Sequence, residues 1–232
     1  MSTGVEAATG AMISLIASLA DNKCALGRRY GEWAVSAPTI ESAVAAAAMA
    51  QDELGHARST YPVLAKLGVT REDDAVDAGH PMHVIEHELP DWAAFIAANL
   101  VVDGILTTFV ASARDSSIEP LAQRARKILQ EEGAHKLHAE SWAKRIAMAG
   151  GHDLDLLLQR IAEMWEQAAR WPGPEDHPGY RDAIEQGMVS EGPDAIRERV
   201  RAWLTGVLRA RRIALALDEP ASWSDWDEEY RR

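Results

Sequence analysis

The chain has 232 residues, 47% of them hydrophobic, and a formal net charge of -12. This length and apolar content can fill one sizeable core, so we expect a single domain spanning residues 1–232. The charge is spread along the chain, which favours solubility and excludes a general affinity for nucleic acid. The single cysteine, Cys24, excludes an internal disulfide framework and fits a reducing compartment, so the expected location is cytoplasmic.

Neither a signal peptide nor a membrane span is expected. The apolar stretch from Met12 to Ala20 lacks a basic leader, is interrupted by serines, and runs directly into Asp21. No stretch reaches the roughly 20 uninterrupted apolar residues that a span requires. The N-terminal stretch is therefore predicted to be a core helix of a protein that does not bind membranes.

Helical periodicity dominates the chain and alternating β-branched runs are missing, so the fold class is predicted to be all-α. Thr39 or Ser42 is expected to open the second helix and Pro62 to end it, and Asp91 is expected to cap the third helix. The connection between them, from Thr70 to Pro90, is expected to be irregular. The long helices of the core bundle, about residues 5–150, are predicted at about 5–33, 39–61, 91–113 and 119–149.

Additional helices and a tail, about residues 154–232, are expected to follow the bundle. Helices are predicted at about 154–170 and 193–216, with a loop of roughly 20 residues between them. The acidic tail contains Trp223 and Trp226, which are candidates for a partner surface.

An internal repeat carries the chemistry. The second predicted helix contains Gln51–His56 and the fourth contains Gln130–His135, and both segments read Gln-acid-Glu-x-x-His. Residues three apart share a helix face, so each segment can present one carboxylate and one imidazole to a common point between helices. This is the spacing of the metal-binding helices in di-iron bundles. The predicted ligands from the repeat are Glu53, His56, Glu132 and His135.

The other two helices of such a bundle each add one carboxylate. Asp103 lies 29 positions before Glu132 in an otherwise apolar helix. Because burying a charge is costly unless it is paired or binds a metal, Asp103 is the candidate ligand from the third helix. The corresponding position in the first helix, 30 before Glu53, is Lys23. The first-helix carboxylate is therefore missing. Asp52 and Glu131, which precede the glutamates of the repeat, could each orient a histidine of a neighbouring helix, although exposed charge is an equally ordinary interpretation.

These residues resemble the ferritin-like subunits of the phenylacetyl-CoA epoxidase family. Leu19–Asn22 and Gly31–Trp33 are similar to the structural subunit, whereas the repeat and Val102–Gly104 are similar to the catalytic subunit. The resemblance implies a ferritin-like four-helix bundle with one or two iron ions. It also implies hydroxylation or epoxidation of an aromatic or acyl-CoA substrate, a separate reductase, and homo- or hetero-oligomers with related ferritin-like subunits. Five of the six iron ligands are matched, and Lys23 stands in place of the remaining glutamate.

Lys23 leaves two hypotheses open. Three carboxylates with a protonated lysine retain about two negative charges, enough for one divalent ion, unless the lysine is deprotonated. The first hypothesis is a di-iron-type monooxygenase. The second is a metal-free, non-catalytic subunit that scaffolds a catalytic relative, with Lys23 replacing the charge of the metal.

Other polar clusters are expected to be ordinary surface. His80, His83 and His87 lie among loop signals and are interpreted as a surface cluster rather than a second metal site. A group of arginines near the C-terminus could meet the phosphates of a CoA thioester, but a solvated helix face is the favoured interpretation. These arginines are Arg197, Arg199, Arg201, Arg209, Arg211 and Arg212.

Overall fold

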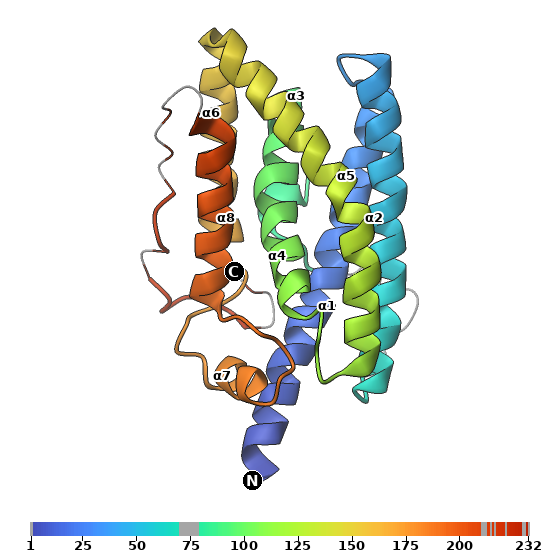
Figure 1. The fold of residues 1–232 in the computed structure, drawn as a ribbon, viewed down its shortest axis with the longest axis vertical. Helices are drawn as coiled ribbons and strands as arrows, with labels where there is room; N and C mark the ends of the chain where they lie inside the picture. The colour runs from blue at the N-terminus through green and yellow to red at the C-terminus, as the bar shows by residue number, and fades with distance from the viewer. Residues whose placement is uncertain are drawn as a thin grey trace.

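Helices make up nearly all of the regular structure in the computed structural model, which describes residues 2–69, 79–209, 213, 215, 217–220, 222–228 and 231. No strand occurs within these residues, so the predicted all-α fold is confirmed. Four helical rods of the described chain pack side by side (Figure 1). They are α1 (Ser2–Trp33), α2 (Ile40–Lys66), a composite rod of α3 (Trp92–Ala97), η3 (Ala98–Asp103) and α4 (Gly104–Ser112), and α5 (Glu119–Ala149).

Helix α2 begins as predicted but ends later. The Thr39 side chain caps it by accepting a hydrogen bond from the backbone N–H of Ser42 at 3.2 Å. The prediction that Pro62 ends the helix is wrong, because Pro62 lies inside α2. Proline removes one backbone hydrogen bond, but the next two residues, Val63 and Leu64, are buried in the core, and this packing holds the last turn in the helix.

The third rod begins where the sequence predicts, since Asp91 Oδ1 accepts a hydrogen bond from the Ala94 N–H at 2.7 Å. Its middle segment, η3, is a π-helix, which the periodicity does not indicate. Trp92–Ser112 is apolar and long enough to cross a membrane, yet 83% of its most apolar window is buried inside the bundle. The rod is therefore the central core helix of the fold.

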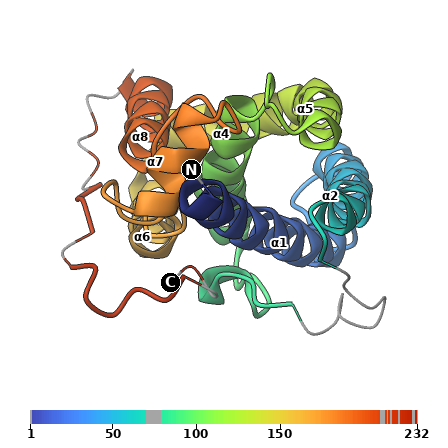
Figure 2. The same ribbon diagram turned by 90° about the horizontal axis from the view of Figure 1, so that it is seen from below.

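The helices α6 (Gly151–Ala168) and α8 (Pro193–Leu208) cover one side of this central rod (Figure 2). Helix α7 (Pro178–Glu185), which lies between them in the sequence, packs against α1. Gly150, at φ 70°, ends α5 as predicted, and α6 begins immediately afterwards, three residues before the expected start.

Helix α7 lies in the segment predicted to be a loop. Pro178 occupies its first position, which suits proline, and His177 caps it by accepting a hydrogen bond from the Tyr180 N–H. Helix α8 ends at Leu208 rather than at 216. The described residues that follow turn back along α6, where Trp165 Nε1 donates a hydrogen bond to the Asp218 carbonyl at 2.8 Å.

The tryptophans of the tail pack against their own chain. The Trp223 ring lies beneath the guanidinium groups of Arg170 and Arg197, with centroid distances of 5.7 and 5.2 Å. Trp226 Nε1 donates a hydrogen bond to the Arg170 carbonyl at 3.1 Å. These contacts anchor the tail, and the interpretation of the two rings as a partner surface stays a prediction.

Buried polar residues of α1 hold the connection that follows α2, of which residues 70–78 lie outside the described part. The Asn22 Oδ1 accepts a hydrogen bond from the Met82 N–H at 2.9 Å, and its Nδ2 donates to the Ser18 carbonyl at 2.8 Å. Asp21 accepts hydrogen bonds from the Tyr61 hydroxyl and the His80 N–H. A Cβ at Gly79 would lie 2.8 Å from Asp21 Cγ, so this close approach requires glycine.

We predict that Asn22→Ala lowers the free energy of unfolding by about 2 kcal/mol, because it leaves the buried Met82 N–H without a partner. Urea denaturation followed by circular dichroism measures the loss. The control is Ser141→Ala at an exposed site on α5, where the change should stay below about 0.5 kcal/mol. Equal stability of Asn22→Ala and the parent would contradict this assignment.

Candidate metal centre

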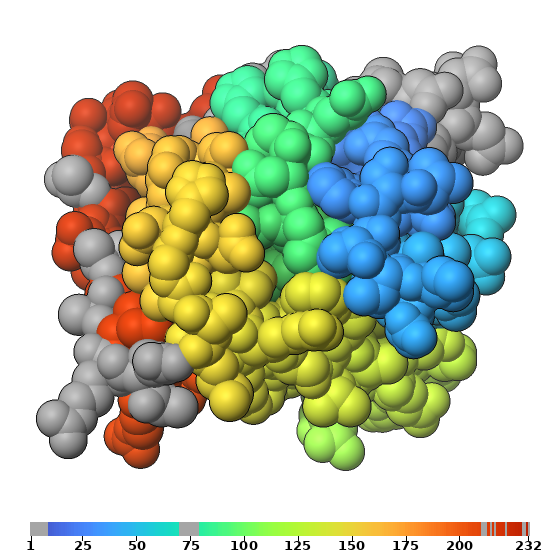
Figure 3. All heavy atoms as spheres, turned by 90° about the horizontal axis from the view of Figure 1, so that it is seen from above, coloured from blue at the N-terminus to red at the C-terminus, as the bar shows by residue number. Residues whose placement is uncertain are grey.

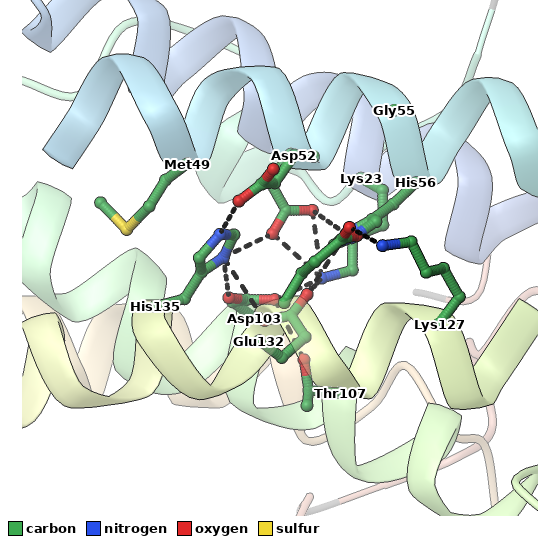
Figure 4. A network of polar contacts seen from close by, with 12 residues as sticks. Lys23, Met49, Asp52, Gly55, His56, Asp103, Thr107, Lys127, Glu132 and His135 are labelled. Carbon is green, nitrogen blue, oxygen red and sulfur yellow. Dashed lines mark hydrogen bonds and ion pairs between the residues drawn. The ribbon is translucent and has the colours of Figure 1, made fainter. Parts of the chain in front are cut away.

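Every rod of the bundle contributes to one buried cluster of charged side chains (Figure 4). Helix α1 provides a lysine, α2 and α5 each provide a glutamate and a histidine, and η3 provides an aspartate. Each of these side chains is at most 4% exposed. The cluster consists of Lys23, Glu53, His56, Asp103, Glu132 and His135.

The Lys23 ammonium lies at the middle of the carboxylates. Its Nζ donates to Glu132 Oε1 at 2.5 Å, to Asp103 Oδ1 at 2.6 Å and to Glu53 Oε1 at 3.1 Å. A protonated lysine has three N–H donors, so each donor has one carboxylate partner. The register predicted from the spacing of the helices therefore brings these four residues together.

The two histidines face the same centre through their Nδ1 atoms. His56 Nδ1 lies 3.4 Å from Glu132 Oε1, and His135 Nδ1 lies 3.2 Å from Glu53 Oε1. Neither Nδ1 atom makes a well-directed hydrogen bond, although both are buried. The contacts between the rings and the carboxylates are therefore mainly electrostatic.

The outer ring nitrogens pair across the helix interface. His56 Nε2 of α2 lies 2.9 Å from Glu131 Oε2 of α5, and His135 Nε2 of α5 lies 3.3 Å from Asp52 Oδ2 of α2. Glu131 also pairs with Lys127 Nζ at 2.5 Å. The internal repeat thus produces two reciprocal acid–histidine contacts, which is the arrangement that the sequence suggests for Asp52 and Glu131. Their role in orienting metal ligands stays a prediction.

Burial and neighbouring charges shift the pKa values of Lys23, Glu53 and Glu132 in opposite directions. Burial disfavours the charged form of Lys23, but the charges of Asp103, Glu132 and Glu53 outweigh it and raise the Lys23 pKa well above its usual value. Burial likewise opposes ionisation of Glu53 and Glu132, but the Lys23 charge lowers the pKa of both carboxyl groups. The lysine is therefore protonated and the carboxylates are ionised at neutral pH.

The histidines are also held in their charged form. Burial lowers the His56 pKa, but the adjacent Glu132 and Glu53 carboxylates raise it to about 9. Burial acts on His135 in the same way, and Asp103 and Glu53 raise its pKa to about 11. Two imidazolium groups and one ammonium then balance the three central carboxylates. Within this cluster, the positive and negative side chains are therefore equal in number without an ion.

The donor chemistry partly fits a metal. One ligand atom from each of Glu53, Asp103, Glu132 and His135 lies within 4.8 Å of all the others, and the set of carboxylate oxygens and imidazole nitrogens is one that iron accepts. The Nδ1 atoms of both histidines, which make no well-directed hydrogen bond, face the same carboxylates. However, the Lys23 ammonium already forms hydrogen bonds with the carboxylate oxygen atoms that an ion would need as ligands. The residues fit one ion only if Lys23 releases them, and they do not fit a two-ion centre with Lys23 in place.

Two residues near the cluster, Tyr30 and Thr107, were not predicted from the sequence. Tyr30, two turns after Lys23 on α1, is buried, and its hydroxyl makes no well-directed hydrogen bond. Thr107, one turn after Asp103, donates a hydrogen bond to Asp103 Oδ1 at 3.3 Å. A cavity of about 230 Å³ opens beside Thr107 and reaches Asp103 and Glu132. The helical spacing from Lys23 and Asp103 was the available signal for Tyr30 and Thr107.

The other polar groups singled out in the sequence lie away from the cluster. His83 is exposed, and its Nδ1 atom lies 2.6 Å from Glu86 Oε2, which agrees with the interpretation of a surface histidine. The solvated face expected for the arginines is wrong for Arg197, which is buried and donates to the carbonyls of Ala169 and Gly173. Arg199 and Arg201 pair with acidic side chains, which argues against a phosphate site here. Arg211 and Arg212 lie outside the described residues.

Together, the helical bundle and its buried carboxylate–histidine cluster define a ferritin-like protein, compatible with a metal site of the carboxylate–histidine type. The chain belongs to the phenylacetic acid catabolic protein family, whose model matches residues 2–232. It is similar to a subunit of the 1,2-phenylacetyl-CoA epoxidase of Escherichia coli (strain K12), with 26% identity over 157 residues. This match covers 65% of the chain and 63% of the relative, so it spans less than two thirds of that protein.

We predict that the metal-free protein loses stability as the pH rises. A histidine whose pKa is raised on folding stabilises the fold fully below its ordinary value of 6.5, and this contribution is lost as the pH passes about 9 for His56 and about 11 for His135. Urea denaturation at a series of pH values in the presence of a chelator measures the decline. His56→Gln should show a smaller decline between pH 6.5 and 9. A free energy of unfolding that stays constant over this range would contradict the charged state.

Proposed function

We propose that this chain is a non-catalytic, metal-free subunit that supports a catalytic relative with the same fold in an oligomeric system of phenylacetate catabolism. The observation that carries the proposal is the Lys23 ammonium, whose Nζ lies within 3.1 Å of all three central carboxylates. Lys23 provides the positive charge that the bundle otherwise needs from a metal. The family membership and the relative, which is named as one subunit of an epoxidase, support the assembly.

The energetic argument rests on the cost of an unpaired buried charge. Removing one partner of a buried ion pair costs about 3–5 kcal/mol, because the remaining charge is left without compensation. Glu53, Asp103 and Glu132 would together be far more costly without Lys23. The lysine therefore lets the chain keep the carboxylates of a metal-binding bundle while folding without an ion.

Substitutions at Lys23 test this role. Lys23→Met should lower the free energy of unfolding by about 3–5 kcal/mol, because the carboxylates lose their counter-charge. Lys23→Glu, which restores a fourth carboxylate, should be less stable still without metal, and Fe(II) should raise its melting temperature. Thermal melts with and without Fe(II) measure both effects.

The matched control is Lys127→Met, which removes a half-exposed lysine from the outer part of the same network. Its melting temperature should change little, since exposed ion pairs contribute about 0–1 kcal/mol. A Lys23→Glu protein that is as stable as the parent in the presence of a chelator would overturn the proposal.

A second candidate function is an O2-dependent oxidoreductase acting on an aromatic or acyl-CoA substrate with a separate reductase. Two features favour it: the Nδ1 atoms of His56 and His135, which face the centre without a well-directed hydrogen bond, and the cavity that reaches Asp103 and Glu132. Glu53, His56, Asp103, Glu132 and His135 would hold iron, which supplies the O2-activating chemistry when bound. Lys23 would have to move away and become neutral for these residues to bind the ion.

Elemental analysis of protein expressed in iron-supplemented medium and purified without chelators decides between the candidates. We expect no stoichiometric iron in a fully folded chain. One ion per chain would support a mononuclear site, and two would favour the oxygenase and require a displaced Lys23. The cytoplasmic location stays a prediction under both functions.

A further inference from the structure

Three neighbouring elements enclose the cavity that reaches Asp103 and Glu132. They are the third rod, α5 and α8, which pack against one another. Figure 3 shows α5, in yellow-green, on the same edge of the molecule as the orange-red residues of α8. The two carboxylates at the inner end are at most 4% exposed, whereas Gly133 and Lys136 on α5 are exposed. The cavity is therefore a route from solvent to the charged cluster, and Gly133 and Lys136 mark its mouth.

The indole ring of Trp203, on α8, is half-buried at this mouth. The ring lies against the backbone of the third rod, because a Cβ added to Gly104 would be only 2.9 Å from Trp203 Cζ3. A side chain at position 104 would push the ring outward. Glycine at this position therefore allows the ring to close against the rod.

Side chains of α5 hold the ring in this position. Trp203 Nε1 donates a hydrogen bond to Glu140 Oε1 at 2.7 Å, and Glu140 Oε2 pairs with Lys144 Nζ at 2.8 Å. The Lys136 ammonium lies 4.8 Å from the centroid of the Trp203 ring. Lys136, Glu140 and Lys144 are spaced by four residues, so they form one row along α5. Because this row lies outside the core, the ring can be released without unpacking the bundle.

We propose that Trp203 is a gate that controls which solutes reach the charged cluster. With the ring held by Glu140 and Lys136, organic solutes are kept away from Asp103 and Glu132. They gain access when the ring swings outward. This inference goes beyond the proposed function, because it concerns the route to the cluster and does not depend on what occupies its centre.

A cysteine inside the cavity measures access. Thr107 lines the cavity beside Asp103 (Figure 4), and Thr107→Cys can be alkylated by the uncharged reagent monobromobimane. Its labelling, followed by fluorescence and peptide mass spectrometry, should be far slower than that of Ser141→Cys at an exposed site on α5. Adding Trp203→Ala should raise the rate at position 107 by about tenfold or more, because the route then stays open without local opening of the chain.

Further substitutions in the Thr107→Cys chain test how the ring is held. Glu140→Ala removes the acceptor of the Trp203 N–H and should raise the labelling rate by about tenfold, because a hydrogen bond to a charged group is lost. Gly104→Ala removes no side chain from the mouth, yet its Cβ displaces the ring and should also raise the rate. The matched control is Trp223→Ala, which removes a half-buried tryptophan from the tail and should leave the rate unchanged.

The native Cys24 reports on the fold in the same experiment. It is buried, so it should stay unmodified in every variant. Labelling of Cys24 at the same rate as position 107 would indicate general unfolding and overturn the gate. Equal labelling rates with and without Trp203→Ala would also contradict the proposal, as would a Thr107→Cys chain that reacts as fast as the exposed control. The assay contains no metal and leaves Lys23 unchanged, so this inference and the proposed function can fail separately.

Discussion

A protonated lysine inside a ring of carboxylates is the constraint on which the bundle depends. Lys23 Nζ reaches carboxylates on α2, η3 and α5, so one side chain of α1 joins all four rods. Each of those carboxylates would be costly to bury alone, and the lysine would be costly to bury without them. The network therefore selects the one register of the helices in which every buried charge has a partner.

The internal repeat gives the site its symmetry. Each histidine has one ring nitrogen facing the centre of the cluster and the other facing an acidic residue of the opposite helix. Asp52 therefore contacts His135 in the same way as Glu131 contacts His56. This arrangement is compatible with a metal site of the carboxylate–histidine type, and the Lys23 ammonium lies at the middle of its carboxylates.

Local sequence signals, such as capping residues and helical periodicity, predicted the long helices well. They failed where tertiary packing had a larger effect on where a helix forms or ends. Thr39 and Asp91 cap their helices as their side chains suggest, because a cap depends only on neighbouring residues. Pro62 did not end α2, since the following residues are buried in the core. Helix α7 and the π-helical η3 were missed, because a short helix is held by tertiary contacts and a single π turn leaves little trace in the apolar pattern.

The all-α class, the repeat, and the set of acids, histidines and Lys23 that forms the cluster could all be predicted from the sequence. These follow from helical periodicity and from spacing along rigid helices, which a linear chain records directly. The contacts of the ammonium with all three carboxylates and the raised pKa values of both histidines could be seen only in the tertiary structure. Those properties depend on distances of a few ångströms between separate helices and on the exclusion of water, which arise when the helices pack.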